Sequence, residues 1–487
     1  MHEDDLRRFL IDQQGRTDED ALEEAERILS EKSEFLLEDF YGYLFDSELN
    51  PPIRSSQVHH DMCAPLSHYY VYTGHNSYLT GNQLNSDSGV DPIIRALQRG
   101  VRVIELDIWP NSTNDDVHVY HGMTLTSHVE LLECLEAIKE HAFSSSPYPV
   151  VLNLENHLTP DLQAKTAMMI CDTFGDLLFK PADFDSMEEF PSPESLMHRI
   201  IVSAEHPEEE DPDCQNSTSA YKHIITIKDG KPKDGVENAL TMINSNTVGQ
   251  LNVSEPDLKA ASESHGANMV RFSQKNIIRV YPKGARIFSS NYNPFIGWTH
   301  GAQMVAFNMQ GFGKSLWQMQ GFFKANGGCG YVKKPDILLD VDSDNYPFDI
   351  QETRPVKTTL KVKLYKGTGW QLDFEKSDFD SFSLPDFYAE VGIAGVPSDV
   401  VMEKTQTVEN CWTPTWNEEF SFPLTVPELA VVHIEVHEED TAERDEFGGH
   451  ACFPVSELRP GIRSVPISDI EGNQHKSVKL LMKFELC

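Results

Sequence analysis

Val101–Trp109 reads VRVIELDIW, and this stretch decides how the rest of the chain is interpreted. Its apolar and polar side chains alternate with a period of two, which predicts a β-strand with two different faces. Glu105 and Asp107 share one face with Val103. Carboxylates at positions i and i+2 on one face lie about 6–7 Å apart, close enough to bind one hard cation. A solvated acidic strand edge would explain an isolated pair better, so the surrounding segments must decide between the two interpretations.

The composition describes a folded and strongly acidic chain. Its 487 residues suggest two to four domains, and a hydrophobic content of 39% is typical of a globular protein. The net charge is −37, from 40 basic and 77 acidic residues. This charge argues against nucleic acid as a partner, and against binding to an anionic membrane unless a cation bridges the two negative surfaces.

The eight cysteines are scattered, without a CxxC pair or a zinc-binding spacing. This pattern predicts reduced thiols and a cytosolic protein. Neither a secretory signal nor an apolar run of membrane-spanning length is recognisable, so we expect any membrane contact to be peripheral.

The chain divides into segments of different character. Residues 1–55 show helical spacing in three stretches, with Thr17 or Asp18 as a cap for the second, and predict a small helical lobe packed on the next domain. They contain no D-x-[DN]-x-[DN]-G calcium loop. Residues 60–206 and 221–339 alternate short strands with helices, which predicts parallel βα units in a doubly wound sheet or a barrel.

Two further segments complete the division. Residues 207–220 are acidic and broken by proline, as in a linker or solvated loop. Residues 340–487 contain short alternating strands without a convincing helix, which predicts an all-β sandwich preceded by a linker.

Polar residues recur where the predicted parallel strands end. The carboxyl ends of such strands form one rim of a barrel, and barrel enzymes carry their chemistry there. One amide and three carboxylates would offer hard oxygen ligands suited to Ca²⁺ or Mg²⁺, and two histidines could act as acid, base or charge stabiliser toward a phosphate. These residues are His75, Asn76, Glu105, Asp107, His121 and Glu155. Each has a structural explanation by itself, but several strand ends would then need polar residues by coincidence.

Longer motifs give the chain a family resemblance. GHNSYL, GVRVIELDIW, VYHGMTLTS and the strand ending LENH resemble the X box of eukaryotic phosphoinositide-specific phospholipases C. VRFSQKNIIRVYPKGARIFSSNYNP, HGAQMVAFNMQ and ANGGCGYVKKP resemble the Y box. The resemblance covers nearly the whole chain, with an EF-hand-like helical remnant and a C2-like sandwich, and without a pleckstrin-homology domain it is similar to plant-type members. It implies a split TIM barrel with X and Y halves over 60–206 and 221–339.

The resemblance also implies an activity. Enzymes of this family cleave phosphatidylinositol 4,5-bisphosphate to diacylglycerol and inositol 1,4,5-trisphosphate in intracellular signal transduction. By motif match, Asn76, Glu105, Asp107 and Glu155 would hold a catalytic Ca²⁺ that lowers the pKa of the inositol 2-hydroxyl. Either Glu105 or Asp107 would take the hydroxyl proton.

The remaining roles follow from the same match. His75 would stabilise the charge on phosphorus, and His121 would protonate the leaving diacylglycerol oxygen and then act in reverse while water opens the cyclic phosphate. Arg279 would bind a ring phosphate and Tyr281 would pack against the inositol ring.

The chain departs from the family pattern at the headgroup. The family commonly has lysines after the strand HRIIV, where this chain has Ser203 and Glu205, and Asn252 stands where a serine is common. A glutamate facing a phosphate is repulsive at short range. We therefore expect relaxed selectivity toward less phosphorylated inositides, unless Arg199 or Lys222 substitutes for the lost lysines.

The predicted sandwich has a candidate cation site of its own. Asp386 precedes one strand, and the loop after VVHIEV is rich in carboxylates, among which Glu438, Asp440 and Glu446 are the candidate ligands together with Asp386. Loop carboxylates at one end of a sandwich suit the Ca²⁺ cup of a C2 domain, although an acidic solvated loop would look the same.

These observations favour a Ca²⁺-dependent phosphoinositide phospholipase C that is monomeric, cytoplasmic and peripheral on the inner face of the plasma membrane. One alternative is a membrane-binding signalling scaffold with the same fold and weakened catalysis, which the lost lysines support. Another is a metal-free bacterial-type lyase, which the clustered carboxylates oppose. A further expectation concerns Glu208–Asp213, whose negative charge could occlude the rim.

Overall fold

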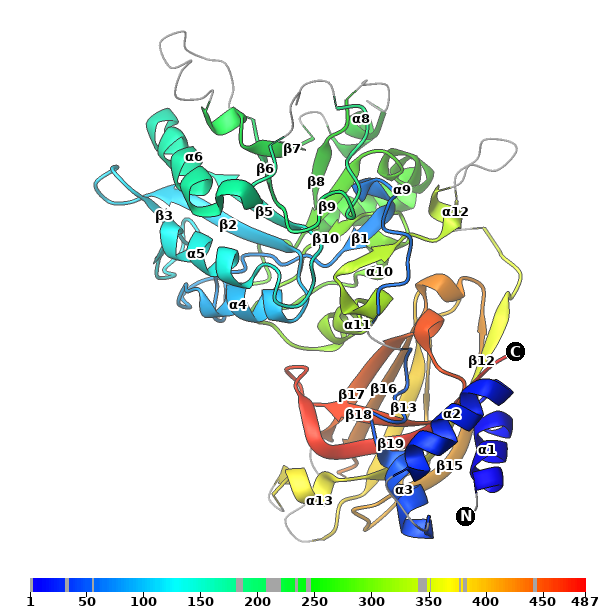
Figure 1. Ribbon diagram of the computed structural model, residues 1–487. Helices are drawn as coiled ribbons and strands as arrows, with labels where there is room; N and C mark the ends of the chain where they lie inside the picture. The colour runs from blue at the N-terminus through cyan, green and yellow to red at the C-terminus, as the bar shows by residue number, and fades with distance from the viewer. Residues whose placement is uncertain are drawn as a thin grey trace. The chain divides into compact units, whose positions relative to one another are not determined.

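The computed structural model describes residues 3–30, 35–54, 57–180, 187–206, 220–232, 235–241, 247–339, 348–350, 352–375, 378–379, 383–440 and 445–487. The acidic segment around Glu208–Asp213 lies outside these residues. The chain forms two compact units (Figure 1). One comprises Ser56–Met319 and Phe323–Glu352, and the other comprises Met1–Ser55, Gln320–Phe322 and Thr353–Cys487. Each unit is described by itself.

The first unit is an α/β unit built around a mostly parallel sheet. Its strands are β1 (Tyr69–Val71), β2 (Val103–Pro110), β3 (Val117–Val119), β4 (Val129–Glu130), β5 (Val150–Asn156), β6 (Ile200–Glu205), β7 (Ile225–Gly230), β8 (Gln250–Ser254), β9 (Ile277–Tyr281), β10 (Met304–Val305) and β11 (Tyr331–Lys333). Its helices are α4 (Asp91–Gln98), α5 (Leu131–His141), α6 (Pro160–Phe174), α8 (Val236–Thr241), α9 (Glu255–Ser273), α10 (Phe295–Trp298), α11 (Lys314–Phe322) and α12 (Asp336–Leu339), with the last residues of α11 assigned to the other unit.

The parallel part of this sheet closes into a barrel. Its strands pair in the order β10-β9-β8-β7-β6-β5-β2. The stretch after β1 joins the two ends, because Thr73 bridges Val103 and Gly74 bridges Phe307, both in parallel. The prediction of parallel βα units is therefore confirmed, and of the two predicted architectures the chain adopts the barrel. β3 and β4 extend the sheet beyond β2 as an antiparallel ribbon.

Both faces of β2 are buried in the α/β unit. All residues from Val103 to Ile108 are buried, so neither face of the strand is solvated. Apolar side chains on the outer face are covered by helices, and Figure 1 shows α4, α5 and α6 lying side by side along β2 and β5. The helix α4 begins with Pro92 in its first turn, and Gly100 just beyond its end has φ of 92°, a conformation in which glycine is favoured.

The second unit contains an antiparallel β-sandwich. Its strands are β12 (Thr358–Thr368), β13 (Phe387–Ala394), β14 (Val401–Lys404), β15 (Thr415–Leu424), β16 (Val431–Glu438), β17 (Glu446–Pro454), β18 (Gly461–Ser468) and β19 (Gln474–Leu486), with the short helix α13 (Trp370–Asp373). They pair in the order β14-β13-β16-β17-β18-β19-β12-β15. The all-β prediction is confirmed, although two of these strands lack the sequence pattern typical of a strand. β14 is an exposed edge strand without apolar alternation, and β18 contains Pro466.

The helical lobe belongs to this second unit. Its helices are α1 (Glu3–Asp12), α2 (Asp18–Leu29), which Thr17 caps through the Asp20 N–H, and α3 (Leu37–Phe45). The sequence predicted packing on the next domain, but the described contacts join the lobe to the sandwich. The buried Arg463 of β18 donates hydrogen bonds to the Asn50 side chain (2.9 Å) and the Gln14 carbonyl (3.0 Å).

Candidate active site

Three carboxylates form an acidic cluster at the carboxyl ends of β2 and β5. The parallel register puts Asp107 of β2 directly opposite Glu155 of β5. One oxygen from each of Glu105, Asp107 and Glu155 lies within 4.8 Å of the other two. Glu105 and Asp107 are only 2% and 4% exposed, whereas Glu155 reaches the surface. The two β2 carboxylates therefore belong to a buried cluster and do not form a solvated strand edge.

Asp107 is the least compensated member of the acidic cluster. Its Oδ1 atom is buried and has no hydrogen-bond partner among the described residues. Burial raises the pKa of Asp107 well above its ordinary value, and the charges of Glu155 and Glu105 raise it further, whereas the Tyr78 hydroxyl and Arg279 oppose this shift. A buried polar atom without a partner costs about 1–3 kcal/mol. This arrangement favours a cation or a proton beside Asp107.

Glu155, in contrast to Asp107, is held in its ionised form. A hydrogen bond from His157 lowers the pKa of Glu155 to about 2, even though partial burial works against this shift. The Nε2 atom of His157 lies 3.2 Å from Oε1 of Glu155, and the imidazole stacks on Trp109 with ring centroids 3.7 Å apart. Glu155 therefore stays ionised near neutral pH.

Asn76 lies beside the acidic cluster in a constrained conformation. Its φ of 43° lies in the left-handed region, and the residue is buried. Its backbone N–H donates to Oε2 of Glu105 at 3.2 Å, and its side-chain NH₂ donates to Oε1 of Gln83 at 3.0 Å. With the NH₂ group engaged in this way, the side-chain oxygen remains as its ligand atom.

The two predicted histidines have matching hydrogen bonds. Nδ1 of His75 lies 2.9 Å from the Asn308 side-chain oxygen, and Nδ1 of His121 lies 2.7 Å from the Gln83 carbonyl oxygen. Both partners are acceptors, so Nδ1 carries a proton in each ring and Nε2 remains for another partner. Burial lowers the pKa of His75, although the nearby Glu105 opposes this shift.

Gln83 connects these groups, and no pattern in the sequence identified it. Its side chain accepts from Asn76 and donates to Asn308 (3.0 Å) and to the Ser289 hydroxyl (2.9 Å), while its carbonyl oxygen faces His121. Gln83 is buried in a loop outside regular secondary structure, so no strand or helix pattern marks it. Gln83 thus contacts Asn76 through its side chain and His121 through its backbone carbonyl, and it reaches His75 through Asn308.

Arg279 of β9 reaches the acidic cluster. Its guanidinium lies 2.5 Å from Oε1 of Glu105, and both side chains are 3% exposed. Burial alone would lower the pKa of Arg279, but Glu105 and Asp229 raise it above its ordinary value, so the group is a permanent cation. In this structure the residue predicted to bind a ring phosphate neutralises a predicted metal ligand.

Ser203 and Asn252 surround a carboxylate that the sequence did not single out. The Ser203 hydroxyl donates to Oδ1 of Asp229 at 2.8 Å, and the Asn252 side chain donates to Oδ2 at 3.0 Å. Gln250 also donates to Asp229 and, at 2.9 Å, to Asn252. Asp229 lies near the end of β7 in a segment, KDG, that reads locally as a turn, and burial raises its pKa.

A cavity of about 160 Å³ connects this network to the acidic cluster. Glu205, Lys231 and Tyr281 line it together with His75 and Arg279. The suggestion that Arg199 or Lys222 replaces the family lysines is wrong. Each residue precedes a strand, β6 or β7 respectively, and so lies at the amino end, whereas Lys231 follows β7 and lines the cavity.

Exposed apolar side chains surround the same rim, and the sequence analysis missed them as well. They lie on the loops after β1, between β3 and β4, after β9 and after β10. Backbone hydrogen bonds from Leu125 to Leu84 and from Gln83 to Ile287 hold three of these loops together. These rim residues are Leu84, Met123, Leu125, Ile287, Phe288 and Phe312, and Met123 is 100% exposed. Such apolar patches mark surfaces that contact a protein or a membrane.

Three of the four candidate cation ligands of the sandwich lie close together, namely Asp386, Glu438 and Glu446. The antiparallel register pairs Glu438 with Glu446, and the Asp386 N–H lies 3.4 Å from Oε1 of Glu438. Burial, with a hydrogen bond to Glu446, raises the pKa of Glu438 to about 7. The Asp440 N–H donates to Asp445 at 3.2 Å, and residues 441–444 between them lie outside the described residues.

Comparisons with known proteins agree with this architecture. Family models for the X and Y domains of phosphatidylinositol-specific phospholipase C match residues 62–206 and 222–337, and the C2 domain model matches 358–467. Phosphoinositide phospholipase C 2 of Arabidopsis thaliana is 50% identical over 100% of this chain and 93% of its own length. Phosphoinositide phospholipase C 6 of the same plant is 52% identical over 92% of this chain and 81% of its own.

Two further similarities extend beyond plants. The mouse protein 1-phosphatidylinositol 4,5-bisphosphate phosphodiesterase delta-3 is 34% identical over 90% of this chain and 59% of its own length. The crystal structure of PLC21 from S. officinalis has a TM-score of 0.82 and 26% sequence identity, covering 99% of this chain. This chain spans 66% of that protein's chain.

A closed parallel barrel with histidines and carboxylates at its carboxyl rim, joined to a C2 domain, defines a TIM-barrel-type enzyme. The chain belongs to the phosphoinositide phospholipase C family. Within the residues that the structure describes, we find no helix whose length and apolar character would suit it to span a bilayer.

Proposed function

We propose that this enzyme hydrolyses phosphatidylinositol 4,5-bisphosphate to diacylglycerol and inositol 1,4,5-trisphosphate in a Ca²⁺-dependent reaction, with weakened preference for the bisphosphate over less phosphorylated inositides. The observation that carries the proposal is the acidic cluster with the unpartnered Oδ1 of Asp107, next to two histidines whose Nδ1 atoms are already engaged. The name of the mouse relative supports the bisphosphate as substrate.

The donor set fits calcium. Asn76, Glu105, Asp107 and Glu155 would hold the ion through oxygen atoms, which Ca²⁺ prefers, and no sulfur or imidazole is needed. The unsatisfied Asp107 oxygen gives such an ion a place where it relieves repulsion. When bound, the ion would supply positive charge that lowers the pKa of the inositol 2-hydroxyl.

The reaction then uses the side chains of this chain in two stages. Glu105 or Asp107 accepts the proton of the 2-hydroxyl, whose oxygen forms a bond to phosphorus while the bond to the diacylglycerol oxygen breaks. His121 donates the proton that the leaving oxygen takes up, and His75 stabilises negative charge on the phosphate oxygens. In the second stage His121 accepts a proton from water, whose oxygen bonds to phosphorus while the bond to the inositol 2-oxygen breaks, and Glu105 or Asp107 returns the proton to that oxygen.

Release of water-soluble inositol phosphates from radiolabelled vesicles across a Ca²⁺ titration tests this proposal. We expect turnover that needs Ca²⁺ and stops in chelator. Absence of turnover at every Ca²⁺ concentration would instead support the scaffold with weakened catalysis. Turnover that is unchanged in chelator would contradict the calcium part of the proposal and leave the hydrolase.

Headgroup recognition involves Arg279 and Tyr281, with Ser203 and Asn252 as indirect contributors. Asp229 engages Ser203 and Asn252, so their polar atoms are partly occupied before a headgroup arrives. Glu205 lies opposite Asp229 in the strand register and adds negative charge to the cavity wall, while Lys231 adds one positive charge. This balance favours headgroups with fewer ring phosphates.

Glu205→Lys should raise the rate on the bisphosphate relative to plain phosphatidylinositol by about tenfold. The substitution replaces repulsion of a ring phosphate with attraction, and partial solvent exposure keeps the effect near 1.4 kcal/mol. Initial rates on vesicles that contain either lipid at equal total concentration measure the ratio. The matched control is Glu136→Lys on α5, where we expect no change. An unchanged ratio in Glu205→Lys would rule out Glu205 as a selectivity determinant.

We also propose that the enzyme is a cytoplasmic monomer that binds peripherally to the inner face of the plasma membrane, where it reaches its lipid substrate. The exposed rim residues would enter the lipid surface and bring the cavity to the headgroup layer. Because the chain carries a net charge of −37, a calcium ion held by Asp386, Glu438, Asp440 and Glu446 would bridge the sandwich to anionic lipid.

Asp440→Asn should weaken Ca²⁺-dependent binding to anionic vesicles, because it removes one negative ligand from the candidate site. Co-sedimentation with vesicles that contain phosphatidylserine measures the effect, with Glu403→Gln on the exposed edge strand β14 as the control. Wild-type binding that persists undiminished in chelator would exclude a calcium bridge.

A further inference from the structure

The β3–β4 ribbon presents three possible metal ligands on one face. His118 of β3 lies directly opposite Glu130 of β4, and Val119 lies opposite Val129. The valines are buried, so alternation sends His118 and Glu130 to the other face of the ribbon. His128 precedes Glu130 by two residues and therefore shares that face. The ribbon register, and not proximity in sequence, brings these side chains together.

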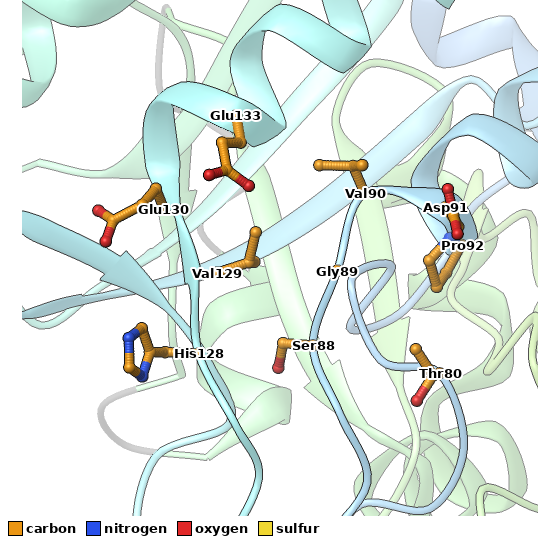
Figure 2. A pocket seen from close by; sticks show the side chains of 10 residues that line it. All are labelled: Thr80, Ser88, Gly89, Val90, Asp91, Pro92, His128, Val129, Glu130 and Glu133. Atoms are coloured by element: carbon orange, nitrogen blue, oxygen red, sulfur yellow. The ribbon is translucent and has the colours of Figure 1, made fainter.

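The three side chains are already close. Nε2 of His118 lies 3.1 Å from Oε1 of Glu130, and the rings of His118 and His128 stack with centroids 4.0 Å apart. One ligand atom from each side chain lies within 4.8 Å of the other two. Figure 2 shows the His128 and Glu130 side chains pointing the same way from the β4 segment, beside a cavity of about 470 Å³.

We propose that His118, His128 and Glu130 form a binding site for Zn²⁺. Two imidazoles and one carboxylate are a donor set that zinc uses in proteins, with water in the remaining position, whereas the oxygen-only acidic cluster suits calcium. Binding displaces the proton that His118 shares with Glu130. His128 is exposed, so its ring can turn out of the stack until a nitrogen faces the ion.

The site has a consequence for the neighbouring loop. Residues 120–128 join β3 to β4 and carry His121 together with the exposed Met123 and Leu125. An ion bound to His118 before this loop and to His128 and Glu130 at its end fixes both ends of the loop to each other. Zinc therefore restricts the segment that positions the candidate acid and two of the rim residues.

Competition with a chromophoric chelator, on the full chain with Ca²⁺ in excess to occupy the oxygen sites, tests zinc binding. We expect His118→Ala, His128→Ala and Glu130→Gln each to lower the affinity of one Zn²⁺ site by about 100-fold or more, because loss of a ligand exceeds the roughly 10–100-fold cost of losing a supporting hydrogen bond. His141→Ala is the matched control, because His141 at the end of α5 belongs to none of the described groups that could hold a metal. Equal zinc binding by wild type and the three variants, or equal loss in the control, would overturn the proposal.

Hydrogen exchange of residues 120–128 tests the restriction separately from catalysis. We expect Zn²⁺ to slow exchange in wild type and to leave His118→Ala unchanged. Zinc binding at this site without slower exchange would refute the effect on the loop. Slower exchange in both wild type and His118→Ala would mean that zinc slows exchange from another site.

Discussion

Replacement of His121 by alanine is expected to lower phosphoinositide turnover by about 100- to 10,000-fold, the contribution that a positioned general acid makes. The structure orients His121 through the Gln83 carbonyl, so Nε2 is the atom that would donate the proton. His121 is only partly buried, and its removal should leave the barrel folded. Release of inositol phosphates under saturating Ca²⁺ measures the effect.

A control separates the loss of the acid from general damage. His141→Ala, near the end of α5, removes a histidine outside the site and should retain full turnover. A substrate with a better leaving group than diacylglycerol should recover much of the His121→Ala rate, because its departure needs less protonation. If His121→Ala turned over the natural lipid at the wild-type rate, the assignment of the acid would be wrong.

Asp107→Asn should lower turnover but raise thermal stability in the absence of calcium. It should reduce Ca²⁺-dependent turnover by at least about 100-fold, because the proposed ion loses a charged ligand. In chelator at neutral pH it should raise the thermal unfolding midpoint of the barrel unit, by about 2–4 °C for each kcal/mol of relieved repulsion. Asn is isosteric and uncharged, so it keeps the packing while removing the charge buried beside Glu105 and Glu155.

The pH dependence of this stabilisation follows from the direction of the Asp107 shift. Because the folded protein raises the pKa of Asp107, the folded state holds the proton more tightly than the unfolded state does. The contribution of Asp107 to stability is therefore largest where Asp107 is protonated, and this contribution is lost as pH rises from about 4 toward the raised pKa. The advantage of Asp107→Asn in chelator should shrink as pH falls toward 4.

Calorimetry from pH 4 to pH 8 in chelator measures the unfolding midpoint and its pH dependence. Release of inositol phosphates in excess Ca²⁺ measures turnover. Asp172→Asn on the exposed side of α6 is the matched control and should shift neither the midpoint nor the turnover. A midpoint of Asp107→Asn below that of wild type at neutral pH in chelator would contradict the repulsion argument.

The sequence was most informative where function follows the local strand pattern. Glu105 and Asp107 share a face of β2 and Glu155 ends β5, so period-two alternation and strand endings were sufficient to predict the cluster. The parallel fold followed from alternating strands and helices. Its closure did not, because the bridges at Thr73 and Gly74 join parts of the chain that are far apart in sequence.

The residues that the sequence did not reveal have no local periodic signature. Gln83 acts from a loop, and its partner Asn308 comes from a distant part of the chain. Asp229 is half-buried because strands β6 and β8 flank it, whereas its own sequence resembles a turn. Arg199 and Lys222 were suggested for their charge alone, and the strand direction puts them at the wrong end of the barrel.

The ion pair between Arg279 and Glu105 has a kinetic consequence under the proposed chemistry. In the protein described here, the arginine acts as a built-in counter-ion for the carboxylate. If Glu105 coordinated a calcium ion, the guanidinium of Arg279 would become free to bind a ring phosphate, so the metal-binding and lipid-binding groups would become available one after the other. Substrate addition would therefore be ordered, with the ion first and the headgroup second. The enzyme would then bind phosphoinositide weakly until the Ca²⁺ concentration rises.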